Sequence, residues 1–250
     1  MALRALIFDV DGTLADTERD GHRVAFNAAF REAGLDWHWD PALYGRLLDV
    51  SGGKERLRHF LDTSGADLAG RRDVDGLIAA LHAAKTRHYT AMLATGAIPL
   101  RAGVARLLRD ARAAGLRLAI ATTTSPENVS ALLRHSLAPD AERWFTTIAA
   151  GDVVPAKKPA PDIYELALAQ LHLPAAECLA FEDSENGIRA SRGAGLRTVV
   201  TVNDYTRGQD FAGAVSVLDG LGEPGSPARV LAGAAPRLGH VTLDDLRSWG

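Results

Sequence analysis

The feature that most constrains the fold is a short apolar run near the start of the chain that ends in two acidic residues and a glycine. Residues 5–8 read Ala-Leu-Ile-Phe and are followed by Asp9, Val10, Asp11 and Gly12. An almost continuously apolar run of this length predicts a strand buried on both faces, as in parallel sheets covered by helices. Two carboxylates this close repel each other, so they are tolerated where a cation lies between them or where one is protonated. The run therefore predicts a buried strand that delivers two acids to a site.

A calcium-binding loop is the structural alternative for this acidic segment. Such a loop needs acidic or amide ligands at every second position, a glycine at the sixth and a glutamate at the twelfth. Here Gly12 follows the second aspartate directly, which does not fit that spacing. Asp9 could instead attack a phosphorus atom, and Asp11 could protonate the departing oxygen. Gly12 would let the chain turn close to the ligand because it has no β-carbon.

Composition favours a folded protein that acts on small ligands. The chain has 250 residues, 47% of them hydrophobic, which is enough to bury a full core. Its net charge is −3 without a basic stripe, so neither nucleic acid nor a membrane is an expected partner. The one cysteine, Cys178, cannot form an internal disulfide, and no apolar run approaches a membrane span. We therefore expect a cytoplasmic protein with Cys178 packed in its core; a monomer is the working expectation, although the sequence leaves the oligomeric state open.

Apolar and amphipathic segments alternate along most of the chain. We predict strands at residues 3–8, 116–121, 146–149, 178–181 and 198–202, and helices at 103–114, 162–171, 185–194 and, after a cap at Thr242, near the C-terminus. This alternation predicts an α/β fold with a doubly wound parallel sheet. Residues 17–94 interrupt it with helical periodicity and no convincing strand. We expect a Rossmann-like core of residues 1–16 and 95–250, and a helical cap of residues 17–94 that can open and close over a site.

Polar segments follow three of the other predicted strands. Thr122, Thr123, Thr124 and Ser125 follow the second strand and offer hydroxyls and backbone donors to a phosphate, although such residues also begin helices. Because ligands collect beyond the carboxyl ends of the strands in an open α/β sheet, we expect these segments to converge with Asp9 on one site.

The other two segments supply charge. Lys158 lies between Lys157 and Pro159 after the third strand, where the prolines would hold the segment extended and Asp162 could cap the next helix. A solvated lysine is the alternative. Glu182 and Asp183 end the fourth strand and offer the oxygen ligands that Mg²⁺ requires, while helix capping by Asp183 or Ser184 is the alternative.

These motifs together resemble the haloacid dehalogenase superfamily of phosphotransferases. The resemblance rests on four segments in order, with a helical cap directly after the first, as in the phosphoglucomutase-like branch: Phe8-Asp9-Val10-Asp11-Gly12-Thr13, Thr122, Lys158-Pro159 and Glu182-Asp183-Ser184. Asp162 and residues 182–188 are also typical of that branch. Residues 34–40 and 50–56 of the cap resemble the CbbY-type sugar-bisphosphate phosphatases associated with carbon fixation in the Calvin cycle.

The resemblance implies a role for each matching residue. Asp9 would be the nucleophile and Asp11 the general acid and then base. Mg²⁺ would be bound by Asp9, the Asp11 carbonyl and Asp183, with Glu182 in support. Thr122 and Lys158 would hold the phosphoryl oxygens. The implied activity is Mg²⁺-dependent hydrolysis of a phosphorylated sugar, xylulose 1,5-bisphosphate being the best candidate, through an aspartyl phosphate.

Substrate choice is expected to lie in the cap. Residues 51–54 (Ser51, Gly52, Gly53 and Lys54) offer backbone donors and a lysine to a second phosphate, with a simple helix start as the alternative. We also expect substrate contacts from other residues near the cleft, although an exposed helix face would show similar residues: Glu18, His22, Tyr44, Lys85, Arg87, Thr123 and Asn128.

Two other functions share these motifs. A sugar phosphomutase of the β-phosphoglucomutase type would use the same four segments, and its aspartyl phosphate would last until a second sugar hydroxyl accepts the phosphoryl group. A non-catalytic sugar-phosphate sensor could retain the fold, but intact Asp9, Asp11, Lys158 and Asp183 argue against it.

Overall fold

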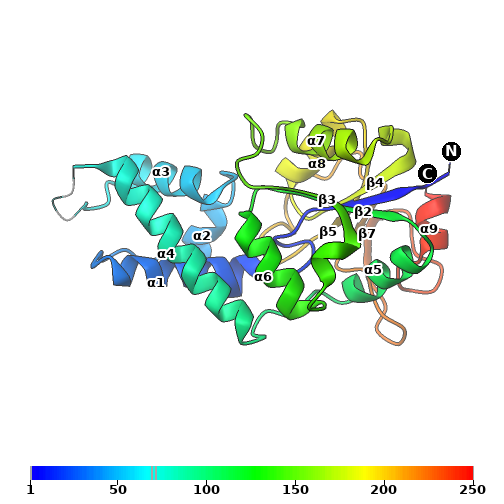
Figure 1. Ribbon diagram of the computed structural model, residues 1–250, viewed down its shortest axis with the longest axis horizontal. Helices are drawn as coiled ribbons and strands as arrows, with labels where there is room; N and C mark the ends of the chain where they lie inside the picture. Colours follow the sequence, from blue (N-terminus) through cyan, green and yellow to red (C-terminus); the bar gives the residue numbers. More distant parts are fainter. Residues whose placement is uncertain (1, 69, 71, 250) are drawn as a thin grey trace.

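The computed structural model describes residues 2–68, 70 and 72–249, which form a seven-stranded sheet and an attached group of helices (Figure 1). The sheet order is β3-β2-β1-β4-β5-β6-β7, parallel except for the antiparallel edge strand β7. The strands are β1 (Ala5–Phe8), β2 (Arg117–Thr122), β3 (Phe145–Ala150), β4 (Cys178–Glu182), β5 (Arg197–Thr201), β6 (Ser216–Leu218) and β7 (Val230–Gly233). The expected α/β fold is confirmed, and β6 and β7 add two strands to the five predicted.

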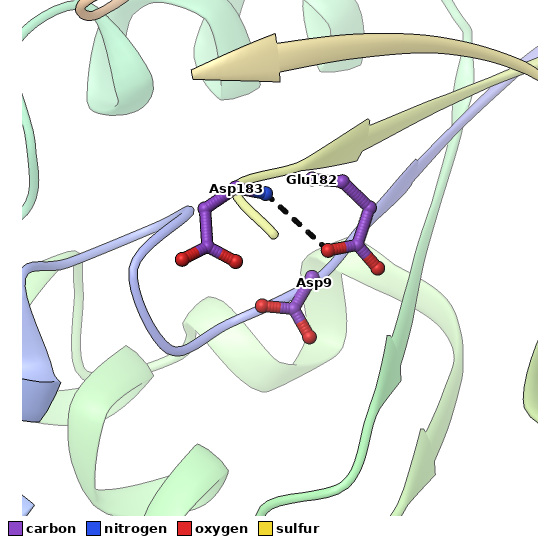
Figure 2. A group of neighbouring side chains, drawn as sticks. All are labelled: Asp9, Glu182 and Asp183. Carbon is purple, nitrogen blue, oxygen red and sulfur yellow. Dashed lines mark hydrogen bonds between the residues drawn. The ribbon is translucent and has the colours of Figure 1, made fainter. Parts of the chain in front are cut away.

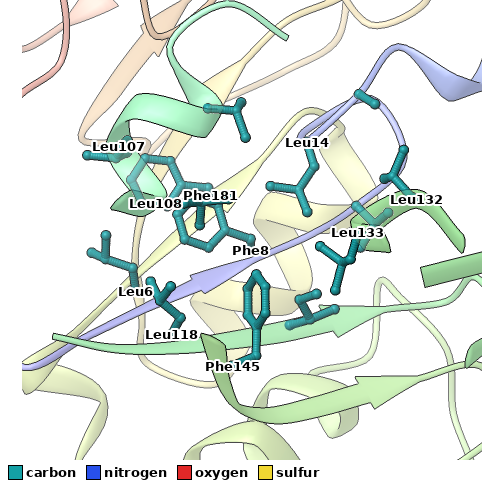
Figure 3. Close-up of a cluster of buried hydrophobic side chains, with 14 of the residues drawn as sticks. Leu6, Phe8, Leu14, Leu107, Leu108, Leu118, Leu132, Leu133, Phe145 and Phe181 are labelled. Carbon is teal, nitrogen blue, oxygen red and sulfur yellow. The ribbon is translucent and has the colours of Figure 1, made fainter. Parts of the chain in front are cut away.

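Helices cover both faces of the sheet, as the apolar first strand predicts. One face carries α5 (Val104–Ala113), α6 (Pro126–Ser136) and α9 (Leu243–Ser248), and the other carries α7 (Asp162–Leu171) and α8 (Glu185–Gly193). Leu6 and Phe8 of β1 point into the first layer, where the Phe8 ring stacks on Phe181 with centroids 4.5 Å apart (Figure 3). Ala5 and Ile7 pack in the second layer. Because strand residues alternate between faces, a strand buried on both sides must be apolar throughout.

The residues after β1 form the expected helical insertion. It comprises a π-helical turn η1 (Glu18–His22), α1 (Arg23–Glu32), α2 (Pro41–Leu47), α3 (Gly53–Ser64) and α4 (Val74–Ala94), and no strand among its described residues. It has its own core of aromatic rings, in which Trp39 packs against Phe26, Phe30 and Phe60. In Figure 1 these helices lie to one side of the sheet, and α4 contacts α6 of the core. The domain boundaries at residues 16 and 95 stay a prediction.

Two further expectations concern the tail and Cys178. Thr242 caps α9 through a reciprocal pair with Asp245, as predicted. Cys178 is fully buried, and burial raises the pKa of its thiol to about 11. Short helical turns η2 (Ala141–Trp144) and η3 (Ala175–Glu177) precede β3 and β4. Among the described residues, none of the helices combines the length and apolar character that a membrane span needs.

Candidate active site

Three carboxylates meet at the carboxyl ends of β1 and β4. Asp9 follows β1 directly, Glu182 ends β4 and Asp183 comes next, and one oxygen from each lies within 4.8 Å of the others (Figure 2). All three side chains are buried. Since β1 and β4 are adjacent and parallel, with Phe8 opposite Phe181, the residue after each strand reaches the same edge.

Lys158 lies among these carboxylates. Its Nζ donates to Asp9 Oδ1 at 2.7 Å, to Glu182 Oε1 at 2.6 Å and to the Ala121 carbonyl at 2.9 Å. Tyr164 on α7 donates its hydroxyl to the same Glu182 oxygen. Burial lowers the pKa of Lys158, but the charges of Asp9 and Glu182 raise it well above its usual value. The lysine is therefore a fixed, charged group, and the alternative of a solvated lysine is wrong.

The segment that carries Lys158 differs from the prediction in two ways. It is a turn rather than an extended segment, closed by a hydrogen bond from the Ala160 backbone N–H to the Lys157 carbonyl at 3.0 Å. Asp162 does not cap α7, because it is already the first residue of that helix and its carboxylate accepts from the Ala156 backbone N–H at 3.3 Å. Pro161 occupies the N-cap position, so the carboxylate ties the turn to the helix instead.

The acidic group carries more negative charge than Lys158 neutralises. Burial and the Glu182 charge raise the pKa of Asp9 to about 7 against the opposing effect of Lys158. Burial, followed by the charges of Asp9 and Glu182, raises the pKa of Asp183 well above its usual value. These three carboxylates carry uncompensated negative charge and offer oxygen atoms as metal ligands. Such a group suits a hard divalent cation such as Mg²⁺. The residues present therefore fit the expected metal.

Gly12 lies against this group, as its position in the sequence predicts. Its φ is +84°, and a β-carbon there would collide with the Asp183 carboxylate and the Asn203 amide. Only glycine accommodates both the left-handed backbone and this approach.

Asp11 turns away from the three carboxylates toward the cap. Its Oδ1 accepts from the Thr17 hydroxyl at 2.6 Å and lies 2.8 Å from His22 Nε2. Burial raises the pKa of Asp11, but the charge and hydrogen bond of His22 and the Thr17 hydrogen bond hold it well below its usual value. His22, which the sequence predicts as a substrate contact, is thus a partner of Asp11 in this structure.

The hydroxyl segment after β2 lies beside the acids. Thr122 is buried, and its Oγ1 accepts from the Thr124 backbone N–H at 3.3 Å, while Thr123 lines the adjoining cleft. Asn128 on α6 lies behind this segment and donates to Thr124 Oγ1 at 3.0 Å. Thr122 and Thr123 are therefore placed to contact a ligand, whereas Asn128 supports the segment from behind.

A cleft of about 610 Å³ lies between the cap and the core. Residues from both parts line it, among them Asp11, Glu18, His22, Gly52, Gly53, Lys54, Arg56, His82, Lys85, Thr123, Asp152 and Lys157. Lys85 is buried, and burial lowers its pKa to about 8 against the raising effect of Asp11 and Glu18. Tyr44 is fully buried and donates its hydroxyl to Glu18. Arg87 is exposed and paired with Glu32, so the structure does not bring it to the cleft.

Lys54 and Lys157 share one carboxylate across the cleft. Lys54 Nζ lies 2.8 Å from Asp152 Oδ2, and Lys157 Nζ lies 2.8 Å from Asp152 Oδ1 and 2.6 Å from Glu55 Oε1. The backbone of Gly52 and Gly53 starts α3 beside them, and Ser51 lines a smaller adjoining cavity with Asp9. At the expected second phosphate site, Lys54 and Lys157 therefore both form ion pairs with Asp152, an acidic residue of the core.

Sequence reasoning missed four residues of this region: Arg56, Asp152, Tyr164 and Asn203. Asn203 follows the predicted strand at 198–202 and Asp152 follows β3, so the strand-end rule that selected Asp183 could have found both. Arg56 is the last residue of the cap segment 50–56, but the resemblance gave it no role of its own, and Tyr164 lies inside α7, where neither spacing nor a motif distinguishes it from an ordinary helix residue.

Comparisons with known proteins identify the family of this chain. The sequence model of the haloacid dehalogenase-like hydrolases matches residues 3–195. The plasmid-encoded protein CbbY of Cupriavidus necator is 51% identical over 99% of this chain and 96% of its own length. The crystal structure of CbbY from Rhodobacter sphaeroides with phosphate has a TM-score of 0.82 and 50% identity, covering 87% of this chain and 94% of that one. An Asp-to-Asn mutant of the same protein, solved with xylulose 1,5-bisphosphate, is 49% identical over the same shares, with a TM-score of 0.82.

Proposed function

We propose that this chain, which belongs to the haloacid dehalogenase-like hydrolases, is a Mg²⁺-dependent phosphatase of a sugar bisphosphate. Xylulose 1,5-bisphosphate is the best candidate substrate. That the chain is a phosphatase acting on sugar phosphates follows from the family and from its CbbY relatives. The metal, the covalent intermediate and the particular sugar are the proposal. Its main support is one observation: the cleft that reaches Asp11 is lined at the same time by Lys54, Lys85 and Lys157.

The geometry supports a two-step reaction at Asp9. The Asp9 carboxylate attacks phosphorus, and as the ester bond breaks Asp11 passes to the sugar oxygen a proton that it receives from His22, which leaves an aspartyl phosphate. Asp11 then takes a proton from water as the water oxygen attacks phosphorus, and inorganic phosphate and the Asp9 carboxylate are released. His22 lies 2.8 Å from Asp11 and provides a route for its proton.

Positioning and cationic charge supply the rest of the catalysis. Lys158 would hold a phosphoryl oxygen while it fixes Asp9, and Thr122 would offer a hydroxyl to another. Asp9, Asp183 and the Asp11 carbonyl would hold Mg²⁺, with Glu182 in support, and the bound cation would neutralise phosphate charge. Because burial and Glu182 raise the pKa of Asp9 to about 7, a bound divalent cation would add to Lys158 in keeping this nucleophile ionised.

Chelation should stop the reaction, and added Mg²⁺ should restore it. Without a cation, Asp9 and Asp183 would face an anionic substrate with only Lys158 to offset them. The measurement is phosphate release from xylulose 1,5-bisphosphate in excess EDTA and after Mg²⁺ is added back. Ca²⁺ should support little turnover, because its looser coordination would displace the attacking carboxylate. Full activity in excess chelator would remove the metal from the mechanism.

Lys54→Ala should reduce kcat/KM for a sugar bisphosphate by about tenfold to a thousandfold and change it little for a small aryl phosphate. A charge-assisted contact to a distal phosphate is worth roughly 1.5–3 kcal/mol, and its binding energy helps to align the other phosphate with Asp9. Arg58→Ala is the matched control, because it removes an exposed cation of α3 that pairs with Asp75 outside the cleft. Equal losses on both substrates would contradict a distal-phosphate role.

Asp152→Asn separates phosphate binding from the cap–core ion pair. This variant keeps Lys54 and removes the charge of its partner. If Lys54 binds the distal phosphate, the variant should therefore retain at least the wild-type kcat/KM. If Lys54 served only the ion pair, Asp152→Asn would lose as much as Lys54→Ala.

The same assays test the mutase alternative, because a mutase would form an isomeric sugar phosphate without releasing phosphate.

A further inference from the structure

The start of the loop between β5 and β6 touches the acidic group. Asn203 Nδ2 donates to Asp183 Oδ2 at 2.7 Å, and Asn203 Oδ1 accepts from the Tyr205 backbone N–H at 2.9 Å. The Asn203 backbone N–H donates to Thr206 Oγ1 at 3.0 Å, which closes the turn. With its oxygen held by Tyr205, the amide of Asn203 can only present its NH₂ group to Asp183.

The same loop touches the cap through its next two residues. The ring of Tyr205 packs against α2, with its centroid 6.1 Å from that of Tyr44 and the ring planes at 68°. A β-carbon at Gly45 would come within 3.1 Å of the Tyr205 ring, so this helix approaches closely at a residue without a side chain. Asp204 pairs with Arg19 of η1. One short loop therefore joins the cap to the side chain that holds Asp183.

We propose that Asn203 is a positioning residue for Asp183 and that Tyr205 links this position to the docked cap. The inference rests on the proposed function, in which Asp183 is a Mg²⁺ ligand. A hydrogen bond to one carboxylate oxygen fixes the rotation of the group and leaves the other oxygen for the cation. Tyr205 contributes both the N–H that orients Asn203 and the ring that contacts the cap. Packing of the ring against α2 holds the backbone of Tyr205, and with it the N–H that orients Asn203, so Mg²⁺ binds more tightly when the cap is docked.

The segment after β1 that carries Asp9 and Asp11 approaches Asp183 and Asn203 at Gly12. A β-carbon at Gly12 would collide with both the Asp183 carboxylate and the Asn203 amide. Asn203, Tyr205 and Thr206 also line the small cavity that contains Asp9 and Lys158. The loop between β5 and β6 is thus part of the wall of the reaction site.

The test is Mg²⁺ affinity measured by calorimetry without substrate, so that it does not depend on turnover. Asn203→Ala should weaken binding by about 10- to 100-fold, the usual cost of losing a group that orients a metal ligand. Tyr205→Ala should weaken it by a smaller factor. Because Tyr205 acts through Asn203, the double variant should bind Mg²⁺ no more weakly than Asn203→Ala alone. The control is Asn186→Ala, which removes another core-to-cap hydrogen bond, to the Asp49 carbonyl, and should keep the wild-type affinity.

Circular dichroism and thermal unfolding of each variant verify that the loss belongs to a folded protein. A wild-type affinity in folded Asn203→Ala would overturn the role of Asn203, and additive losses in the double variant would overturn the link through Tyr205. If the wild-type protein itself bound no Mg²⁺, the proposed metal site would fail and this inference with it. Wild-type binding that is insensitive to Asn203→Ala would overturn the inference alone.

Discussion

Asp9→Asn is expected to lower kcat by about 10⁴-fold or more, the scale of losing a nucleophile, while the protein remains folded. The amide has the shape of the carboxylate and its oxygen can still accept the hydrogen bond from Lys158. Burial and Glu182 raise the pKa of Asp9 to about 7, above the usual value that the unfolded chain retains. Between these two pKa values the folded state still holds the proton that the unfolded state has lost, so the free energy of unfolding falls as the pH rises. At pH 8 in chelator, the variant should therefore unfold at the wild-type temperature or above it.

The measurement combines phosphate release with thermal unfolding and with calorimetric binding of the sugar bisphosphate. Retained binding together with lost turnover would place the defect in the chemical step. Activity within about tenfold of wild type would contradict covalent catalysis by Asp9, and a large fall in unfolding temperature would show that the carboxylate is structural.

Much of the core could be predicted from the sequence because its strands are buried on both faces. Residues 5–8 are apolar without interruption, and the structure buries Leu6 and Phe8 under one helical layer and Ala5 and Ile7 under the other. Strand β7 was missed for the opposite reason. All four of its residues are exposed at the edge of the sheet, and its pairing with β6 is long-range, so no local pattern of burial marks it.

The acids of the site were predictable because each follows a buried strand, whereas their partners were not. The strand-end rule selects Asp9, Glu182 and Asp183, and the structure brings all three together. Whether a cap side chain faces the cleft depends on how the cap packs against the core. Lys85 and Arg87 lie two residues apart on α4, yet the first lines the cleft and the second pairs with Glu32 in solvent. Sequence spacing alone does not settle such orientations.

Lys158→Met is expected to lower the free energy of unfolding by about 3–5 kcal/mol in chelator at neutral pH and to abolish turnover. Lys158 lies between Asp9 and Glu182 and is itself buried, so its loss leaves two buried carboxylates without their cation. Lys158 lowers the pKa of Asp9, so its loss raises that pKa further, and the deficit should shrink as pH falls. Denaturant unfolding at several pH values measures the change.

The double variant Lys158→Met/Glu182→Gln distinguishes the two roles of the lysine. The second substitution removes one stranded charge while the glutamine oxygen can still accept the Tyr164 hydroxyl, so most of the lost stability should return. Turnover should not return, because no cation would hold the phosphoryl oxygens beside Asp9. If the double variant were as unstable as Lys158→Met, Glu182 would not be the charge that the lysine compensates. If it recovered activity together with stability, Lys158 would act only by keeping the site folded, and its contact with the phosphoryl group would have to be abandoned.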